Sequence, residues 1–292
     1  ELEKAGTSFR SNSDTEVLLE LLARDGTSAL EKLVGMFAFA LWDKEKRELI
    51  LARDRLGIKP LVYAPLVDGN IAFASEITAL RKHPGIDLTT DADAVSEYLA
   101  CLYVPAPRTI FNGIRKLPPG HVLRWHDGNI SIDAYWRPQY DGTAMMTADE
   151  AVEELMPILR QAVTDRLVSD VPLGCFLSGG IDSSVIAALM ANEAKRTGAP
   201  PIQTFTMTFD EAAYDERSNA RKVAEYIGSQ HTELPASPSL VDLLDDSVTS
   251  FGEPFGNPTS LLINDLSRKA REHVTVALVG DGGDEVFAGY PR

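Results

Sequence analysis

Residues 173–184 read Leu-Gly-Cys-Phe-Leu-Ser-Gly-Gly-Ile-Asp-Ser-Ser, an apolar run that leads into a glycine-rich turn. We expect a strand over Leu173–Leu177 and then a helix from about Ser183 to Thr197, with apolar residues recurring on one face. Further strand candidates at 203–209, 229–233 and 275–279 alternate with helical patterns, and another helical pattern at 149–169 precedes them. This alternation predicts a parallel, doubly wound α/β sheet, in which ligands sit beyond the carboxyl ends of the strands.

The glycine turn has the composition of a phosphate cradle. Gly179 and Gly180 leave backbone N–H groups open to an anion, and the following helix points its positive end at the same place. Hydroxyl donors flank the glycines at Ser178, Ser183 and Ser184. Asp182 would repel phosphates unless it holds Mg²⁺, which bridges carboxylate and phosphate oxygens. The turn by itself therefore predicts an anion cradle in which Asp182 binds a metal ion.

A second glycine turn follows the last strand candidate, where residues 279–285 read Val-Gly-Asp-Gly-Gly-Asp-Glu. Its three acidic residues could complete a metal site or contact an activated intermediate. For either turn taken alone, a tight strand-to-helix connection without chemistry is the alternative. The chain has no Gly-x4-Gly-Lys-Ser/Thr motif, and Glu285 stands where a dinucleotide fingerprint needs its third glycine. P-loop and nicotinamide-dinucleotide chemistry are therefore disfavoured.

The first half of the chain has short alternating segments that predict an antiparallel sheet with helices alongside, an α+β layered domain. Ser13 and Glu16 have the spacing of a capping box that opens a helix ending at Gly26, with Val17, Leu18, Leu21 and Leu22 facing inward. Strand candidates are 36–42, 48–53, 61–64 and 70–75, and a later hairpin lies between two Pro/Gly breaks. The stretch from about 138 to 147 is polar and small, and it is a candidate linker.

Composition limits the classes of function. The formal charge of −15 on 292 residues argues against a nucleic-acid surface, which needs clustered Lys and Arg. Cys101 and Cys175 are expected in apolar surroundings and form neither a disulfide framework nor a metal site, so we expect a cytoplasmic protein. No apolar run reaches the roughly 18 residues of a membrane span. The chain begins at Glu1 without a Met and ends after a glycine turn, so we expect an internal fragment.

Taken together, these motifs resemble the glutamine-hydrolysing asparagine synthetases, which are class II glutamine amidotransferases. Ser-Gly-Gly-x-Asp-Ser at 178–183 resembles the pyrophosphate-binding signature of ATP pyrophosphatases. Residues 35–40, 52–61 and 73–76 resemble the glutaminase domain, and residues 169–172 and 280–290 resemble the synthetase domain. The resemblance extends over nearly the whole chain.

The resemblance implies a fold of two domains. Residues 1–140 are expected to be part of an αββα N-terminal-nucleophile glutaminase domain, truncated at its N-terminus. Residues 141–292 are expected to be part of a doubly wound adenine nucleotide α-hydrolase-like domain, truncated at its C-terminus. A homodimer is one assembly that the resemblance leaves open.

The resemblance also implies two reactions of a carbon–nitrogen ligase. An N-terminal Cys hydrolyses glutamine, and the synthetase domain adenylates an acceptor carboxylate with ATP and Mg²⁺ before ammonia displaces AMP. Asp14 matches the carboxylate that receives the glutamine α-amino group. The pyrophosphate loop matches Ser178–Ser184, adenosine contacts match Phe176 and Met207, further ATP contacts match Val279 and Gly280, and magnesium ligands match Asp182 and Asp284.

Two departures from the family pattern matter. The nucleophilic Cys is expected upstream of Glu1, so we expect this fragment not to hydrolyse glutamine. Asp281 stands where the family usually carries a Glu that acts in intermediate formation, and its side chain reaches about an ångström less. Aspartate is therefore the first acceptor hypothesis. Another carboxylate, such as a surface-polysaccharide sugar or a β-lactam precursor, is the second, and a non-catalytic remnant of the fold is the third.

Three features also have an ordinary structural explanation. Asp14 is also explained as a first-turn acid favoured by the helix dipole. Arg53–Arg55 is expected to be a solvated or ion-paired strand end. The loop Phe251–Ser260 is a candidate for acceptor specificity, and an ordinary Pro/Gly connector is its alternative.

Overall fold

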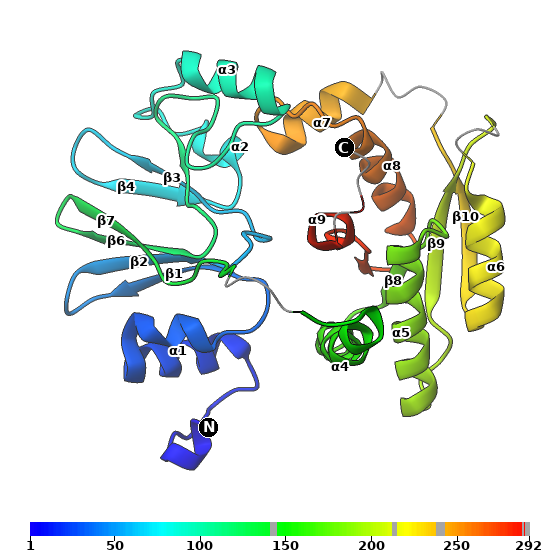
Figure 1. Cartoon of the computed structure of the whole chain (residues 1–292). Coiled ribbons are helices and arrows are strands. Elements are labelled where there is room, and N and C mark those ends of the chain that lie inside the picture. Colours follow the sequence, from blue (N-terminus) through cyan, green and yellow to red (C-terminus); the bar gives the residue numbers. More distant parts are fainter. Residues whose placement is uncertain (141–144, 212–214, 238–242, 288, 290–292) are drawn as a thin grey trace. The chain divides into compact units, whose positions relative to one another are not determined.

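The structure is a computed structural model that describes residues 1–140, 145–211, 215–237, 243–287 and 289 (Figure 1). The chain divides into two compact units. Unit 1 comprises Glu1–Asp141 together with Val248–Asn257, and unit 2 comprises Gly142–Ser247 together with Pro258–Arg292. Residues 141–144 of the candidate linker lie outside the described part of the chain. Residues 288 and 290 of the matched stretch 280–290 also lie outside it.

Unit 1 consists mainly of antiparallel strands with short helices. Its helices are η1 (Glu3–Ala5), α1 (Asp14–Asp25), η2 (Gly26–Lys32), α2 (Ile77–Leu80) and α3 (Ala92–Cys101), and its strands are β1 (Ala38–Asp43), β2 (Glu48–Arg53), β3 (Val62–Pro65), β4 (Ile71–Ala74), β5 (Arg115–Lys116), β6 (His121–His126) and β7 (Asn129–Ala134). The strands form a four-stranded sheet in the order β1-β2-β6-β7 and a three-stranded sheet in the order β4-β3-β5.

Successive side chains of β2 and β3 point to opposite faces of their sheets, and each face packs against a different layer of unit 1. Leu51 of β2 faces a core shared with Leu61 and Tyr63, so the two sheets pack against each other. The opposite face of the four-stranded sheet, with Ala52, packs against residues of α1 and η2. The far face of the three-stranded sheet packs against α2. The result is the expected helix–sheet–sheet–helix layering.

The start of α1 differs from the sequence prediction. Ser13 is the N-cap, and its hydroxyl accepts a hydrogen bond from Thr15 N–H at 3.2 Å. Glu16 does not bond back to Ser13, because its carboxylate accepts from the backbone N–H groups of Arg10 and Ser11 at 2.8 and 2.7 Å. The predicted capping box is therefore wrong, since Glu16 orders the preceding turn instead. Leu21 and Leu22 are buried as expected, whereas Val17 is 43% exposed.

Unit 2 alternates strands and helices. Its strands are β8 (Leu173–Phe176), β9 (Gln203–Thr208), β10 (Gln230–Pro235) and β11 (Val276–Leu278), and its helices are α4 (Ala148–Arg166), α5 (Ile181–Thr197), α6 (Arg217–Ile227), α8 (Thr259–Ala270) and α9 (Gly283–Phe287), with α7 (Leu244–Phe251) crossing the boundary between the units. No helix in the described part of the chain is both long and apolar enough to span a membrane.

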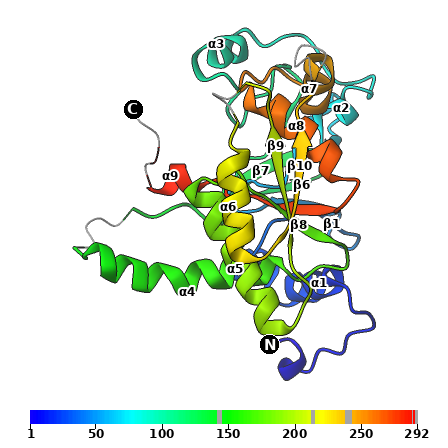
Figure 2. The ribbon, with the colours of Figure 1, turned by 90° about the vertical axis from the view of Figure 1, so that its right-hand side faces the viewer.

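The strands of unit 2 form one parallel sheet in the order β10-β9-β8-β11, which confirms the predicted parallel arrangement. Helices cover both faces. Cys175 and Leu177 pack against α5 and α6, whereas Phe205 and Met207 pack against α8 on the other face. Figure 1 shows α6 and α8 on opposite sides of β9 and β10, and Figure 2 shows the sheet from the α6 side. The strand order reverses at β8, because β9 and β11 lie on either side of it.

Helix α5 begins earlier than the sequence predicted. Its first residue is Ile181 and its N-cap is Gly180, whose backbone is extended. The prediction placed the start near Ser183 because it treated Ile181 and Asp182 as part of the turn. Ser184 N–H instead bonds to the Gly180 carbonyl at 3.1 Å, so the first helical turn already includes the acidic residue.

Candidate functional site

A pocket of about 290 Å³ opens in unit 2 at the carboxyl ends of β8, β9 and β11. The reversal of strand order between β8 and β11 is where doubly wound sheets bind ligands. Eight residues predicted from the sequence line this pocket: Phe176, Ser178, Asp182, Ser183, Met207, Val279, Gly280 and Asp281. Gly179, Gly180, Ser184 and Asp284 are not among its lining residues. Residues from two turns about 100 positions apart in the sequence therefore meet at one site.

Hydrogen bonds within the first glycine loop fix its hydroxyls. The hydroxyls of Ser178 and Ser183 lie 3.0 Å apart, and the Ser183 hydroxyl also accepts from the Ser178 backbone N–H at 3.3 Å. Gly180 N–H donates to the Ser178 hydroxyl at 3.1 Å. Ser184 Oγ is buried and has no hydrogen-bond partner among the residues that the structure describes. A buried hydroxyl in that state is available to donate a hydrogen bond to a phosphate oxygen.

Gly179 is required by the fold as well as by any ligand. Its φ is +83°, a conformation that favours glycine. A Cβ there would lie 2.6 Å from Ala220 N and 2.7 Å from the Asn219 side chain, so α6 approaches the loop too closely for a side chain. The sequence argument, which attributed this glycine to an approaching anion, therefore missed its packing role.

The second glycine loop packs directly on the first. A Cβ at Gly280 would lie 2.7 Å from Ser183 N, and a Cβ at Gly283 would overlap the Asp182 carboxylate. The absence of side chains at these two positions is what lets the loops meet. Asp281 then lines the pocket, while Asp284 follows Gly283 in the first turn of α9.

The other wall of the pocket is apolar. Phe205 and Met207 of β9 are buried against Leu266 of α8, and Ile263 of α8 lines the same wall. Thr206 donates its hydroxyl hydrogen to the Leu177 carbonyl, which anchors the end of β8. The pocket thus has a polar end at the glycine loops and an apolar end under α8, a division that suits a nucleotide.

Sequence reasoning missed Glu216, Ile263 and Leu266, which also line the pocket. No local motif marks them, because they reach the site through the packing of α6 and α8. Phe251–Ser260, the candidate specificity loop, contributes no residue to the lining of this pocket.

The predicted magnesium ligands lie on adjoining turns. Asp182 is in the first turn of α5 and abuts Gly283, the residue before Asp284. Within the described ranges, no group of three or more His, Cys, Asp or Glu residues could hold a metal ion. Two carboxylates without a full protein cage fit Mg²⁺, because Mg²⁺ is usually bound by one or two carboxylates together with substrate phosphates and water.

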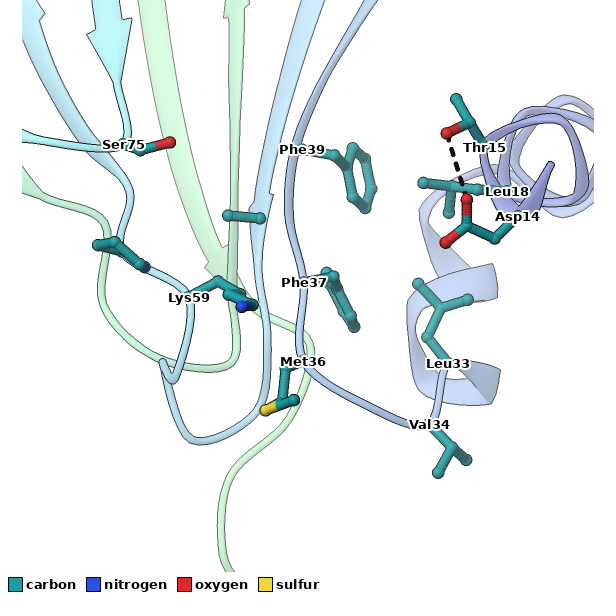
Figure 3. A pocket seen from close by; sticks show the side chains of 12 residues that line it. Asp14, Thr15, Leu18, Leu33, Val34, Met36, Phe37, Phe39, Lys59 and Ser75 are labelled. Carbon is teal, nitrogen blue, oxygen red and sulfur yellow. Dashed lines mark hydrogen bonds between the residues drawn. The ribbon is translucent and has the colours of Figure 1, made fainter. Parts of the chain in front are cut away.

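A second pocket, of about 500 Å³, lies in unit 1 and contains Asp14. In Figure 3, Asp14 and Thr15 lie on one side of Phe37 and Phe39, and Lys59 lies on the other. Thr15 donates to Asp14 Oδ1 at 3.5 Å. The pocket therefore offers a carboxylate and an ammonium group over an apolar floor. The sequence had not suggested Lys59.

Arg53 and Asp54 do not form the solvated or ion-paired strand end that the sequence predicted. Asp54 is 1% exposed, and its carboxylate accepts from the backbone N–H groups of Phe37, Ile58 and Lys59 at 3.3, 3.0 and 2.9 Å. Arg53 donates to three backbone carbonyls, and burial lowers its pKa. These side chains replace missing backbone partners and fix the loop next to the Asp14 pocket.

The two cysteines differ in environment. Cys175 is fully buried on β8, and burial raises the pKa of its thiol to about 12. A thiol with that pKa stays protonated near neutral pH and is a poor nucleophile. Cys101 is exposed at the end of α3, which corrects the expectation of apolar surroundings for it. Neither cysteine lines the Asp14 pocket.

Two family models match successive parts of the chain. A family model described as a glutamine amidotransferase domain matches residues 1–136, and one described as asparagine synthase matches residues 154–292. Glutamine-hydrolysing asparagine synthetase 1 of Bacillus subtilis (strain 168) is 35% identical over 99% of this chain and 45% of its own length. A putative asparagine synthetase of Mycobacterium tuberculosis (strain ATCC 25618 / H37Rv) is 36% identical over 98% of this chain and 44% of its own.

A relative with a different name also matches. Amidase chyE of Penicillium rubens is 31% identical over 97% of this chain and 44% of its own length. The chain therefore spans less than half the length of these curated relatives. Among solved structures, a glutamine-dependent NAD⁺ synthetase from Acinetobacter baumannii has a TM-score of 0.34 at 14% identity, over 96% of this chain and 68% of that chain, which is too weak a likeness to bear on function.

The fold and the two matched models define a class of protein, one that joins a glutamine amidotransferase domain to an asparagine synthase domain. The sequence relatives narrow that class. The chain belongs to the glutamine-hydrolysing asparagine synthetase family.

Proposed function

We propose that the natural protein is an ATP-dependent amidotransferase. It adenylates an acceptor carboxylate, aspartate in the leading hypothesis, releases pyrophosphate, and then amidates the acceptor with ammonia from glutamine. The observation that carries this proposal is the unit 2 pocket, where two acidic glycine loops meet at the ends of neighbouring parallel strands.

The glycine loops would perform the phosphate chemistry. The N-terminus of α5 and the hydroxyls of Ser178, Ser183 and Ser184 would hold the phosphates that leave as pyrophosphate. An oxygen of the acceptor carboxylate attacks the α-phosphorus, and the bond to pyrophosphate breaks. Ammonia then attacks the acyl carbon, loses a proton, and AMP leaves. Asp281 is the acidic group that we assign to formation of the intermediate.

The remaining residues would position the substrate. The apolar wall with Phe176 and Met207 would receive adenosine, and Val279 and Gly280 would make a further contact to ATP. Mg²⁺ bound at Asp182 and Asp284 would offset the negative charge of the phosphates. This offset matters because these 292 residues carry a formal charge of −15.

Unit 1 would supply ammonia. Asp14 would receive the α-ammonium group of glutamine in the pocket that it lines. Cys175 is not the nucleophile of that reaction, because its buried thiol stays protonated. The nucleophile of the family is an N-terminal Cys, and we propose the same for the natural protein.

A different acceptor remains the second candidate. Asp281 replaces the usual Glu, and one relative that matches nearly the whole chain is named an amidase. A sugar carboxylate or an internal carboxylate of a β-lactam precursor would use the same loops with other acceptor contacts.

ATP–pyrophosphate exchange in the natural full-length protein tests the proposal. We expect exchange that depends on aspartate, and we expect Asp182→Asn to reduce it about 100-fold, since a magnesium ligand and its charge are lost. Glu225→Gln removes one negative charge from the exposed face of α6 and serves as the matched control. It should stay within about twofold, or 0.4 kcal/mol in activation free energy.

The acceptor decides among the three hypotheses. Exchange driven only by another carboxylate would replace aspartate as the acceptor and leave the mechanism intact. Absence of exchange with every carboxylate tried would contradict the proposal and favour a non-catalytic remnant of the fold.

A further inference from the structure

The unit 2 pocket contains one carboxylate more than magnesium binding and formation of the intermediate require. Three acidic side chains line it, those of Asp182, Glu216 and Asp281. Asp182 is proposed to bind Mg²⁺, and Asp281 is proposed to act in formation of the intermediate. Glu216 has neither task, and it comes from the N-terminal end of α6 rather than from a glycine loop.

The backbone of Glu216 is fixed beside the first glycine loop. Its carbonyl accepts from Asn219 N–H at 3.0 Å and from Ala220 N–H at 3.1 Å, which starts α6. The same two residues pack against Gly179 so closely that a Cβ would not fit there. Helix α6 also lies beside α5 on one face of the sheet (Figure 2). Glu216 is therefore held next to the loop that we propose to bind the leaving pyrophosphate.

The side chain of Glu216 is available to a ligand, whereas its charged neighbours are not. Arg217 forms an ion pair with Asp215 at 2.5 Å and donates to the Phe209 carbonyl at 2.7 Å. The Asp215 side chain is only 17% exposed. Glu216 is exposed, and its carboxylate makes no capping bond to the first N–H groups of α6. Of these three charged groups, the Glu216 carboxylate alone lines the pocket.

The charge of the pocket limits what this carboxylate can bind. None of the described residues that line the pocket is Lys, Arg or His. The phosphates of ATP are negative, so a carboxylate beside them is unfavourable unless it contacts a cation. Mg²⁺ is assigned to Asp182 and Asp284, which belong to the two loops that meet at Gly283. The remaining cation among the proposed substrates is the α-ammonium group of aspartate.

We propose that Glu216 binds the ammonium group of the acceptor and thereby selects an amino acid as acceptor. This ionic hydrogen bond would hold the acceptor while its reactive carboxylate attacks the α-phosphorus. A carboxylate without an amino group, such as a sugar carboxylate, would leave Glu216 unpaired beside the phosphates and would bind less tightly. The inference rests on the proposed function and names the class of its acceptor.

Equilibrium binding to the natural full-length protein tests Glu216 without catalysis. The nucleotide is the magnesium complex of α,β-methylene ATP, in which the bond that the reaction breaks is replaced. The two probes are L-aspartate and succinate, which differ only in the amino group. In titration calorimetry we expect Glu216→Gln to weaken aspartate binding about tenfold, or 1.4 kcal/mol, because an ionic hydrogen bond is lost. Succinate should bind no more weakly to the variant than to the wild type.

ATP–pyrophosphate exchange supplies the matching kinetic result. Glu216→Gln should raise the KM for aspartate about tenfold and leave kcat within about threefold, because the reacting groups are unchanged. Glu216→Asp keeps the charge and should retain more of the aspartate affinity than Glu216→Gln does. Glu225→Gln removes the same charge from an exposed position of α6 outside the pocket, and it should leave KM and kcat within about twofold.

The outcomes separate this inference from the proposed function. Absence of exchange with every carboxylate in the wild type would overturn the proposed function. Aspartate-dependent exchange with unchanged aspartate affinity in Glu216→Gln would overturn the role of Glu216 alone. Normal exchange with reduced amide formation would also overturn it, because Glu216 would then act in the attack of ammonia.

Two further results would contradict the role of Glu216. Equal weakening of aspartate and succinate would mean that Glu216 shapes the pocket instead of binding the amino group. Loss of α,β-methylene ATP binding in a variant with a wild-type circular dichroism spectrum would mean that Glu216 holds the nucleotide. If Glu216→Gln does not fold, Glu216→Asp decides, since its shorter side chain must still weaken aspartate more than succinate.

Discussion

Gly283 leaves open the space that the Asp182 carboxylate occupies. Since Gly283 is the first residue of α9, alanine would suit its backbone, and only the side chain of Asp182 would have to move. We expect Gly283→Ala to reduce ATP–pyrophosphate exchange about tenfold, or 1.4 kcal/mol, with little loss of thermal stability. Val286→Ala, at an exposed position of the same helix, is the control. If Gly283→Ala leaves ATP–pyrophosphate exchange unchanged, the reaction does not depend on the exact position of the Asp182 carboxylate.

At the same scale, Asp54 and Glu16 show where sequence reasoning stops. Both are charged residues in segments with an ordinary local explanation, a strand end and a capping box. Their actual partners are backbone N–H groups. For Asp54 these groups belong to Phe37, Ile58 and Lys59. Sequence spacing identifies an available carboxylate, but it does not say which unpaired backbone donor will lie beside it.

The order of strands and helices could be predicted because it depends on local periodicity. β2 was predicted with its observed bounds, and the strands of unit 2 were placed within two residues of theirs. The glycine loops of the candidate site were likewise visible as motifs. The contribution of α8 was not, because Ile263 and Leu266 reach the pocket through packing across the sheet. The membership of Val248–Asn257 in unit 1 has no local signal either.

Helix α8 is tied to the end of β10 by a buried carboxylate. Asp265 is 1% exposed and accepts from Ser237 N–H at 2.9 Å and from Lys269 Nζ at 2.8 Å. Burial tends to raise the pKa of Asp265, but these bonds outweigh it and the pKa lies below 3.8. The folded protein therefore binds this proton more weakly than the unfolded chain does.

A pH dependence follows for this element. The stability that Asp265 contributes is fully present above about pH 3.8, the unfolded pKa, and is lost as the pH falls through the lower folded pKa. We expect Asp265→Asn to destabilise the protein by about 2 kcal/mol at neutral pH and to flatten the acid limb of its stability profile. Denaturant unfolding between pH 3 and pH 7 measures both effects, with Asp246→Asn, an exposed ion-pair partner of Arg268, as the control. Parallel acid limbs for wild type and Asp265→Asn would contradict the assignment.

The net charge acts at the scale of the whole molecule. A chain with formal charge −15 repels nucleotide at long range, and salt screens that repulsion. We therefore expect the KM for the magnesium complex of ATP to fall about twofold as the ionic strength rises from about 0.02 to about 0.15 M. A nucleic-acid-binding surface shows the opposite trend, since salt weakens phosphate binding there. Steady-state exchange at fixed free Mg²⁺ provides the measurement, and a KM that rises with salt would contradict this account.

The close packing of Gly179 against α6 affects how related sequences are compared. Since Asn219 and Ala220 exclude a side chain there, selection for folding alone retains this glycine after catalysis has been lost. A descendant without enzymatic activity would then still have a glycine at position 179. The informative positions are those that the fold does not require, chiefly Asp182 and Ser184, and their substitution in a homologue would mark the loss of the reaction.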